Sequence, residues 1–131
     1  MLLKYLTPML WTDDLAKTIS FYQTVLGFEL DEHNEGWGWC HMHKDKVSLM
    51  FCRPFGEDAS SYKGPAFTGS LYIYTDDVDG LWQTLRETVT VSYPIGNYAH
   101  RMREFAILDN NRYMLQFGRE MRDDETVTDC D

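Results

Sequence analysis

The chain has 131 residues, of which 44% are hydrophobic and 15% aromatic, and it carries a formal charge of −9. This length suits one domain with a hydrophobic core. The acidic balance argues against partners with phosphate groups, whether nucleic acid or anionic lipid, and no apolar run reaches the roughly 20 residues that cross a bilayer. The three cysteines follow no metal-binding spacing and fit reduced thiols. We therefore expect a cytoplasmic protein with no nucleic acid partner and no membrane partner.

An internal repeat is the strongest signal in the chain. Residues 10–15, Leu-Trp-Thr-Asp-Asp-Leu, recur as residues 73–78, Ile-Tyr-Thr-Asp-Asp-Val. Each copy follows an apolar segment with the character of a strand. The Thr and Asp side chains can accept hydrogen bonds from the free N–H groups of a first helical turn, so each Thr-Asp-Asp predicts a helix start.

Apolar residues continue at helical spacing after each of these starts. The first series ends at Gly27, a residue typical of helix C-termini. The two series are Leu15, Ile19, Tyr22 and Leu26, and Val78, Leu81, Trp82 and Leu85. Two helices are therefore predicted, each with one buried face.

Each helix is followed by room for three strands. In the first copy we expect strands at residues 28–33, 37–43 and 46–53, with a two-residue turn at Lys44-Asp45. In the second copy we expect them at residues 89–93, 102–108 and 112–119. The final strands share a Leu-x-Phe-x-Arg pattern, which supports the repeat.

The predicted fold class is therefore α+β, with two tandem βαβββ modules forming a curved mixed sheet around a cleft and the helices outside. We expect one domain over residues 1–118, made of modules 1–53 and 67–118 joined by a linker at 54–66. Six of the 21 acidic residues lie between Glu120 and Asp131. Residues 119–131 are expected to form a disordered acidic tail.

This order of motifs resembles the glyoxalase/bleomycin-resistance/dioxygenase superfamily, also called the vicinal-oxygen-chelate superfamily. The resemblance lies in Asp14-Leu15, Phe21-Tyr22, Leu26-Gly27-Phe28 and residues 105–111. The chain departs from the family's Asp-Pro-x-Gly turn, because Asn110 and Arg112 stand in place of Pro and Gly. The departure puts the local geometry of that turn in question.

The resemblance implies four cleft positions that bind a divalent ion in the metal-using members. Carried over by position, they are Thr7, Met50, Ser70 and Gln116. Only the amide of Gln116 suits such an ion, since hydroxyls bind weakly without a carboxylate and a thioether prefers soft metals. We therefore expect no metal and no cofactor. A rival pair, His41 and His43, shares a strand face, but no acid is evidently placed to complete a site.

Strand alternation then predicts which side chains line the cleft. The expected ligand-binding residues are Thr7, Met9, Trp11, Trp37, Trp39, His41, Met50, Ser70, Tyr72, Tyr74, Glu104, Met114 and Gln116. Aromatic rings and methionines at these positions suit a planar ligand. The alternative is that the same residues form core or a dimer interface.

Glu104 is the candidate carboxylate of this cleft. It can hold a cationic group, or act as a base if burial raises its pKa. Alternatively, it pairs with Arg101 or Arg103 at the surface.

The favoured function is a metal-free homodimeric protein that binds an aromatic or cationic small molecule, as the resemblance to bleomycin-binding proteins implies. The alternative is a lyase, isomerase or dioxygenase of the same superfamily, with displaced metal ligands or with Glu104 as base. A third possibility is a regulator that uses its sheet faces for association.

Overall fold

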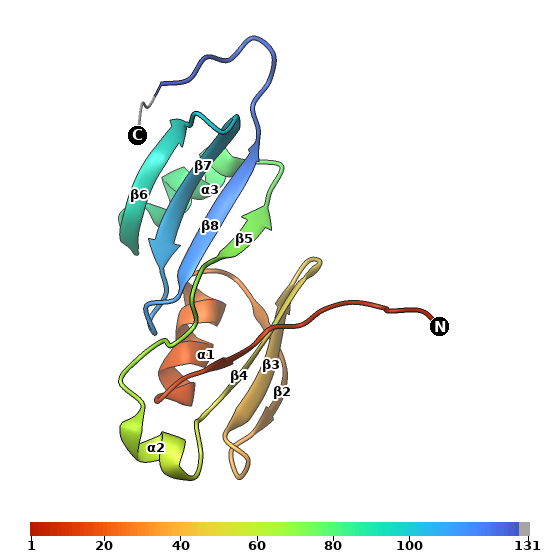
Figure 1. The fold of residues 1–131 in the computed structure, drawn as a ribbon, viewed down its shortest axis with the longest axis vertical. Helices are drawn as coiled ribbons and strands as arrows, with labels where there is room; N and C mark the ends of the chain where they lie inside the picture. The colour runs from red at the N-terminus through yellow and green to blue at the C-terminus, as the bar shows by residue number, and fades with distance from the viewer. Residues whose placement is uncertain (129–131) are drawn as a thin grey trace. The chain divides into compact units, whose positions relative to one another are not determined.

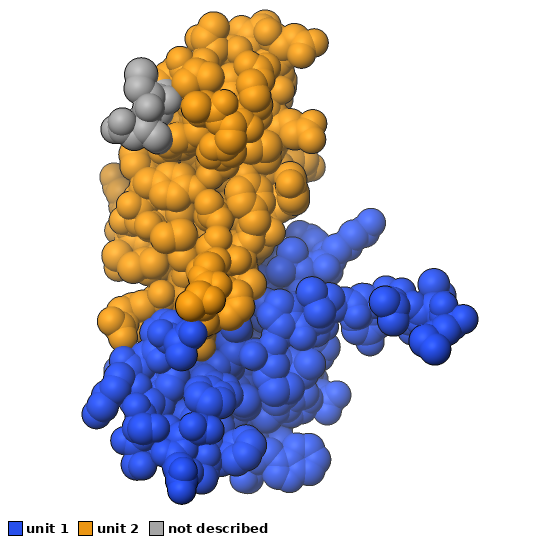
Figure 2. Space-filling view, viewed as in Figure 1, with its two compact units in different colours: residues 1–66 blue, residues 67–131 orange. Residues whose placement is uncertain are grey.

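A computed structural model of the chain describes residues 1–128. The chain divides into two compact units between Ala66 and Phe67 (Figure 2). Each unit contains one four-stranded mixed sheet with a helix packed against it (Figure 1). Within the described residues, none of the helices is long and apolar enough to span a membrane.

The first unit holds one sheet with the strand order β1-β4-β3-β2. Its elements are β1 (Met9–Trp11), α1 (Leu15–Thr24), β2 (Glu29–Asn34), β3 (Trp39–Lys44), β4 (Val47–Cys52) and α2 (Glu57–Ser61). Strand β1 runs parallel to β4, and the other pairs are antiparallel. The short helix α2 lies in the segment predicted to link the two modules, residues 54–66.

The second unit repeats this topology with the order β5-β8-β7-β6. Its elements are β5 (Leu71–Tyr74), α3 (Val78–Leu85), β6 (Thr90–Asn97), β7 (Met102–Leu108) and β8 (Met114–Glu120). Strand β5 is parallel to β8, as β1 is to β4. The predicted α+β class with two βαβββ modules is confirmed.

Both predicted helix starts are confirmed by N-cap hydrogen bonds. The Asp14 carboxylate accepts from the backbone N–H of Lys17 at 2.9 Å, and that of Asp77 from the N–H of Gly80 at 3.0 Å. At the other end of α1, Gly27 takes a φ of 76°, which closes the helix without a side-chain clash.

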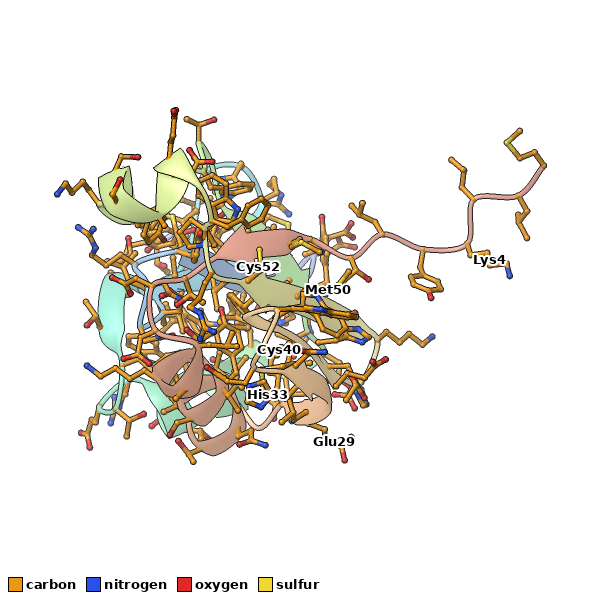
Figure 3. The ribbon with its side chains drawn as sticks, turned by 90° about the horizontal axis from the view of Figure 1, so that it is seen from below. Lys4, Glu29, His33, Cys40, Met50 and Cys52 are labelled. Atoms are coloured by element: carbon orange, nitrogen blue, oxygen red, sulfur yellow. The ribbon has the colours of Figure 1, made fainter. Side chains whose placement is uncertain are left out.

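Alternation along the strands separates the core from the opposite sheet face. In the first unit Met42, Leu49 and Phe51 are buried on the side of the sheet that carries α1. The ring of Tyr22, from α1, lies 4.9 Å from that of Phe51. Cys40 is also buried on this side, and burial raises the pKa of its thiol to about 11. Figure 3 labels Cys40 among the strands, and Lys4 on the N-terminal segment that extends away from them.

The turn between β3 and β4 lies one residue later than predicted. Lys44 pairs with Val47, so Asp45 and Lys46 form the turn, and Asp45 takes a φ of 52°. Asp tolerates this left-handed conformation better than Lys does. His43 therefore lies opposite Ser48 rather than Lys46. The correction shifts the pairing by two residues, which leaves every side chain on its predicted face.

The turn between β7 and β8 departs from the family pattern as the sequence indicates. Arg112 takes a φ of 73°, although it carries a side chain where the family has Gly. The Asp109 carboxylate accepts from the backbone N–H groups of Asn111 and Tyr113, both at 2.8 Å. These bonds hold the turn against a left-handed cost of about 1–2 kcal/mol.

The C-terminal segment differs from its prediction. Strand β8 continues to Glu120, past the predicted strand end at residue 119 and the expected domain boundary at Gly118. Beyond it, Glu125 forms a 2.7 Å ion pair with Arg119, and the N–H of Thr128 donates to the carbonyl of Asn97 at 2.9 Å. The expected disorder therefore does not hold for residues 119–128. Cys130 and the remainder of the predicted tail lie outside the described residues.

Candidate functional site

The candidate site lies on one face of the second unit's sheet. Helix α3 packs against β7 and β8, and the ring of Trp82 lies 5.1 Å from that of Phe105. Because side chains alternate along β7, Phe105 and Ile107 face this helix while Glu104 faces the opposite side. A carboxylate therefore stands on the face that α3 leaves uncovered.

Glu104 is buried and engaged by side chains from three places in the unit. Its side chain is 1% exposed. The hydroxyl of Tyr72 donates to Oε1 at 3.0 Å, and the hydroxyl of Tyr93 donates to Oε2. Nε2 of His100 lies 2.6 Å from Oε1. The expected alternative, a surface pair with an arginine, is wrong, because Arg103 binds Asp79 instead.

Gln116 completes this arrangement from β8. Its Nε2 donates to the hydroxyl of Tyr93 at 2.7 Å and approaches Oε2 of Glu104 at 3.4 Å. Its Oε1 accepts from the hydroxyl of Ser70. We call Tyr72, Tyr93, His100, Glu104 and Gln116 the Glu104 cluster.

The cluster holds an ionised carboxylate beside neutral phenols. Burial raises the pKa of Glu104, but hydrogen bonds from Tyr93, His100 and Tyr72 together outweigh burial, and the net pKa is lowered. Burial and the bond to Glu104 raise the pKa of Tyr72, and burial above all raises that of Tyr93 to about 12. The condition set for Glu104 to act as a base, a pKa raised by burial, is therefore not met. A carboxylate with a lowered pKa is a weak base at neutral pH.

Gly118 makes room for the Tyr72 phenol. A Cβ at position 118 would overlap the Tyr72 hydroxyl and lie 2.9 Å from Cβ of Glu104. Gly118 is directly opposite Glu104 on the neighbouring strand. The phenol crosses β8 at the one residue that has no side chain, and this crossing brings it to the carboxylate.

The structure brings together four residues that the sequence predicts for the site: Ser70, Tyr72, Glu104 and Gln116. Tyr93 and His100 were not predicted. Register shifts on either side of Tyr93 break the alternation along β6, so counting residues does not give its facing. Pro94 and Gly96 in the same strand are the sequence signal for such irregularity. His100 lies in the loop between β6 and β7, where alternation makes no prediction.

The first unit presents a smaller polar group on its own sheet. Nε2 of His41 lies 2.6 Å from the Ser48 hydroxyl, and the Thr7 hydroxyl donates to Ser48 at 3.3 Å. On the same face, the indole N–H of Trp39 donates to the sulfur of Met50 at 3.2 Å. Thr7, Trp39, His41 and Met50 therefore lie together within this unit, on the face that strand alternation predicts.

The other predicted site residues are placed less distinctively. Trp37 is 76% exposed and lies before β3, since that strand begins two residues later than predicted. Met9 and Tyr74 are also exposed, and Met114 is half-buried at the start of β8. The ring of Trp11 packs edge-on against Tyr62 at 6.1 Å.

His41 and His43 have an acidic neighbour that sequence spacing did not reveal. Asp31 lies 2.8 Å from Nδ1 of His43 and 3.8 Å from Nδ1 of His41. The hydrogen bond to Asp31 raises the pKa of His43. Within residues 1–128, however, no three His, Cys, Asp or Glu side chains are grouped so that they could hold a metal ion.

Some members of the superfamily that the chain resembles bind a metal at four positions. In this chain those positions do not offer a suitable set of donors for a divalent ion. They supply two hydroxyls, a thioether and an amide, with no carboxylate or imidazole among them. Their donors are also occupied within each unit, since Thr7 bonds to Ser48, Met50 accepts from Trp39, and Ser70 bonds to Gln116. These residues do not fit a divalent ion.

The sequence model of the Glyoxalase/Bleomycin resistance protein/Dioxygenase superfamily matches residues 4–117. The chain belongs to this superfamily. The match spans both βαβββ modules and includes the Glu104 cluster.

Curated and solved relatives agree with this assignment. A bleomycin resistance protein from Geobacillus stearothermophilus is 24% identical over 127 residues, which cover 88% of this chain and 96% of the relative. The crystal structure of TioX from Micromonospora sp. ML1 has a TM-score of 0.73 at 15% identity, covering 90% of this chain and 99% of TioX. A bleomycin-binding protein from Streptomyces verticillus, complexed with copper(II)-bleomycin, has a TM-score of 0.66 at 24% identity, covering 88% and 97%.

Proposed function

We propose that this protein binds an aromatic or cationic small molecule at the Glu104 cluster and does so without a metal. The observation that carries the proposal is the buried, ionised carboxylate of Glu104 on the sheet face opposite α3. Holding a charge in such a place is costly unless it is paired, and a positively charged ligand group is a natural pair. The aromatic rings of Tyr72 and Tyr93 flank the carboxylate and suit a planar group.

The relatives support a binding role. One is a bleomycin resistance protein and another a bleomycin-binding protein in complex with its ligand. Bleomycin is therefore the first probe for this chain. The homodimer and the cytoplasmic location stay predictions.

Binding accounts for the cluster better than acid–base catalysis does. A general base works best when its pKa is near the working pH, whereas the pKa of Glu104 is lowered below its ordinary value. Both oxygens of the carboxylate also already accept hydrogen bonds. A lyase or isomerase that uses Glu104 as base would need these bonds to be released first.

Calorimetric titration tests the proposal. The probes are bleomycin and a set of planar aromatic cations, each compared with an uncharged analogue. The proteins are the wild type, Glu104→Gln and the matched control Glu87→Gln, whose residue is exposed in the same unit. We expect Glu104→Gln to weaken binding of the cationic probes at least tenfold and Glu87→Gln to leave it unchanged.

Failure of every probe to bind the wild type, or equal binding by all three proteins, would overturn the proposal. Thermal shift gives an independent readout, because a ligand at 100 times its Kd stabilises the fold by about 2.7 kcal/mol. Elemental analysis of the purified protein tests the metal-free part. More than about half an equivalent of a transition metal per chain, by the stoichiometry of a single site, would contradict it.

A further inference from the structure

His100 differs from the other partners of Glu104 in its exposure. Its side chain is 59% exposed, whereas Glu104 is 1% exposed and Tyr72, Tyr93 and Gln116 are half-buried. The three half-buried partners stand on β5, β6 and β8, so the backbone of each is hydrogen-bonded into the sheet. His100 instead lies in the loop that joins β6 to β7. It is therefore the partner that can leave the carboxylate at least cost.

The imidazole of His100 is held as a flat, hydrogen-bonding ligand would be. One of its faces stacks on the ring of Tyr98, with centroids 6.2 Å apart and planes 21° apart. Its edge directs Nε2 to Oε1 of Glu104 at 2.6 Å. Tyr98 is itself fixed, since its hydroxyl donates to the carbonyl of Pro94 at 2.6 Å and its ring packs edge-on against Tyr93. Tyr98 and Glu104 therefore both have hydrogen-bond partners other than His100 within the second unit.

We propose that His100 is an internal stand-in for the ligand, and that the ligand carries a planar cationic N–H group, of the imidazolium, guanidinium or amidinium kind, which displaces His100 from Glu104. This inference rests on the proposed function and names its substrate class. A planar group of this kind would stack on Tyr98 and donate a charge-assisted hydrogen bond to Oε1 of Glu104. A compact ammonium group would make the hydrogen bond without the stacking.

The stand-in also explains how an acidic residue stays buried in the absence of ligand. Without His100, Oε1 would keep the bond from Tyr72 but lose its closest partner. The His100 imidazole supplies a hydrogen-bonding partner to Oε1, with Nε2 at 2.6 Å. Ligand binding therefore exchanges one partner of Oε1 for another and leaves the Glu104 carboxylate hydrogen-bonded throughout.

Removal of the stand-in gives the first test. In His100→Ala, the space left by the imidazole should accept free imidazole. We expect this variant to bind imidazole or methylguanidinium at least tenfold more tightly than the wild type does. NMR titration of the backbone amides in β7 and β8 measures this affinity. Thiazole, which has the size of imidazole but no N–H donor, should not bind. The double variant His100→Ala/Glu104→Gln should lose the gain, because it lacks the carboxylate.

A second measurement uses the wild type and does not depend on a variant that folds. The ring resonances of His100 should shift towards those of an exposed histidine as methylguanidinium is added. The inference would be overturned if the His100 ring keeps its resonances at saturating methylguanidinium. It would also be overturned if a folded His100→Ala variant binds imidazole no better than the wild type. If bleomycin still binds the wild type in either case, the proposed function stands while the stand-in role fails. If imidazole binds the His100→Ala variant but no larger probe binds the wild type, the proposed function fails instead.

Discussion

The phenol of Tyr72 crosses β8 at Gly118, and the absence of a side chain there allows its hydroxyl to reach Glu104. Tyr72 and Gly118 belong to the neighbouring parallel strands β5 and β8, in which Tyr72 pairs with Gln116 and Tyr74 pairs with Gly118. A Cβ at Gly118 would occupy the place of the Tyr72 hydroxyl. The geometry of the Glu104 cluster therefore depends on Gly118, which contributes no side chain to it.

Gly118→Ala should push the Tyr72 phenol away from the carboxylate. We expect a loss of about 1–3 kcal/mol in the free energy of unfolding, which is typical of overpacking, and a weaker affinity for cationic probes. Denaturant unfolding and calorimetric titration measure the two effects. Gly36→Ala is the control, because its added methyl would meet Asn34 at an ordinary 3.4 Å. Equal stability of the two variants would show that the Tyr72 crossing is not tightly packed.

Glu104→Gln should destabilise the protein at neutral pH and much less in acid. Hydrogen bonds from Tyr93, His100 and Tyr72 lower the pKa of Glu104 against the effect of burial, so the folded state favours the ionised form. Stability from this source is present above the unfolded pKa, 4.5, and is lost as the pH falls through the lower folded value. Comparing denaturant unfolding of both proteins at neutral pH and in acid measures the change. We expect a difference of about 1–3 kcal/mol at pH 7 that shrinks below about pH 4. A difference independent of pH would mean that the carboxylate is not ionised in the folded protein.

Asp77→Ala should remove the N-cap of α3. Its carboxylate accepts from the N–H of Gly80 at 3.0 Å, and loss of such a cap costs about 1 kcal/mol. Thermal unfolding checks this, with the exposed neighbour Asp76→Ala as control. If both substitutions lower the melting temperature alike, general charge removal rather than capping is responsible.

Glu125→Gln should loosen the C-terminal segment from the sheet. The Arg119 guanidinium holds the pKa of Glu125 at about 2, so the ion pair stabilises the fold at neutral pH and is lost as the pH falls towards that value. We expect faster amide hydrogen exchange in residues 121–128 at pH 7, while Asp123→Asn leaves exchange unchanged. Equal exchange in wild type and Glu125→Gln would show that other contacts, such as that of Thr128 with Asn97, hold the segment alone.

Most of the fold could be predicted because the sequence pattern of one module recurs in the other. The repeated Thr-Asp-Asp places both helix starts, and the Asp14 and Asp77 caps form as expected. The faces of β3 and β4 also follow from alternation, even though the turn begins at Asp45 rather than at Lys44. A period of two tolerates an error of two residues in pairing.

Only part of the candidate site could be predicted, because alternation gives the facing of side chains only on regular strands. Ser70, Tyr72, Glu104 and Gln116 stand on regular strands, where counting gives the facing. Tyr93 stands between two irregularities in β6, and His100 in a loop, so neither has a period to follow. The contacts of residues 121–128 depend on tertiary pairing with Arg119 and Asn97, which an acidic composition does not reveal.

A crystal structure of the protein with a bound planar cation, or with bleomycin, would show directly whether Glu104 and Tyr98 hold the ligand. We expect a cationic nitrogen of the ligand within hydrogen-bonding distance of Oε1 of Glu104, a planar group stacked on Tyr98, and His100 displaced from the carboxylate. A ligand bound elsewhere, with the His100–Glu104 contact still at 2.6 Å, would contradict it.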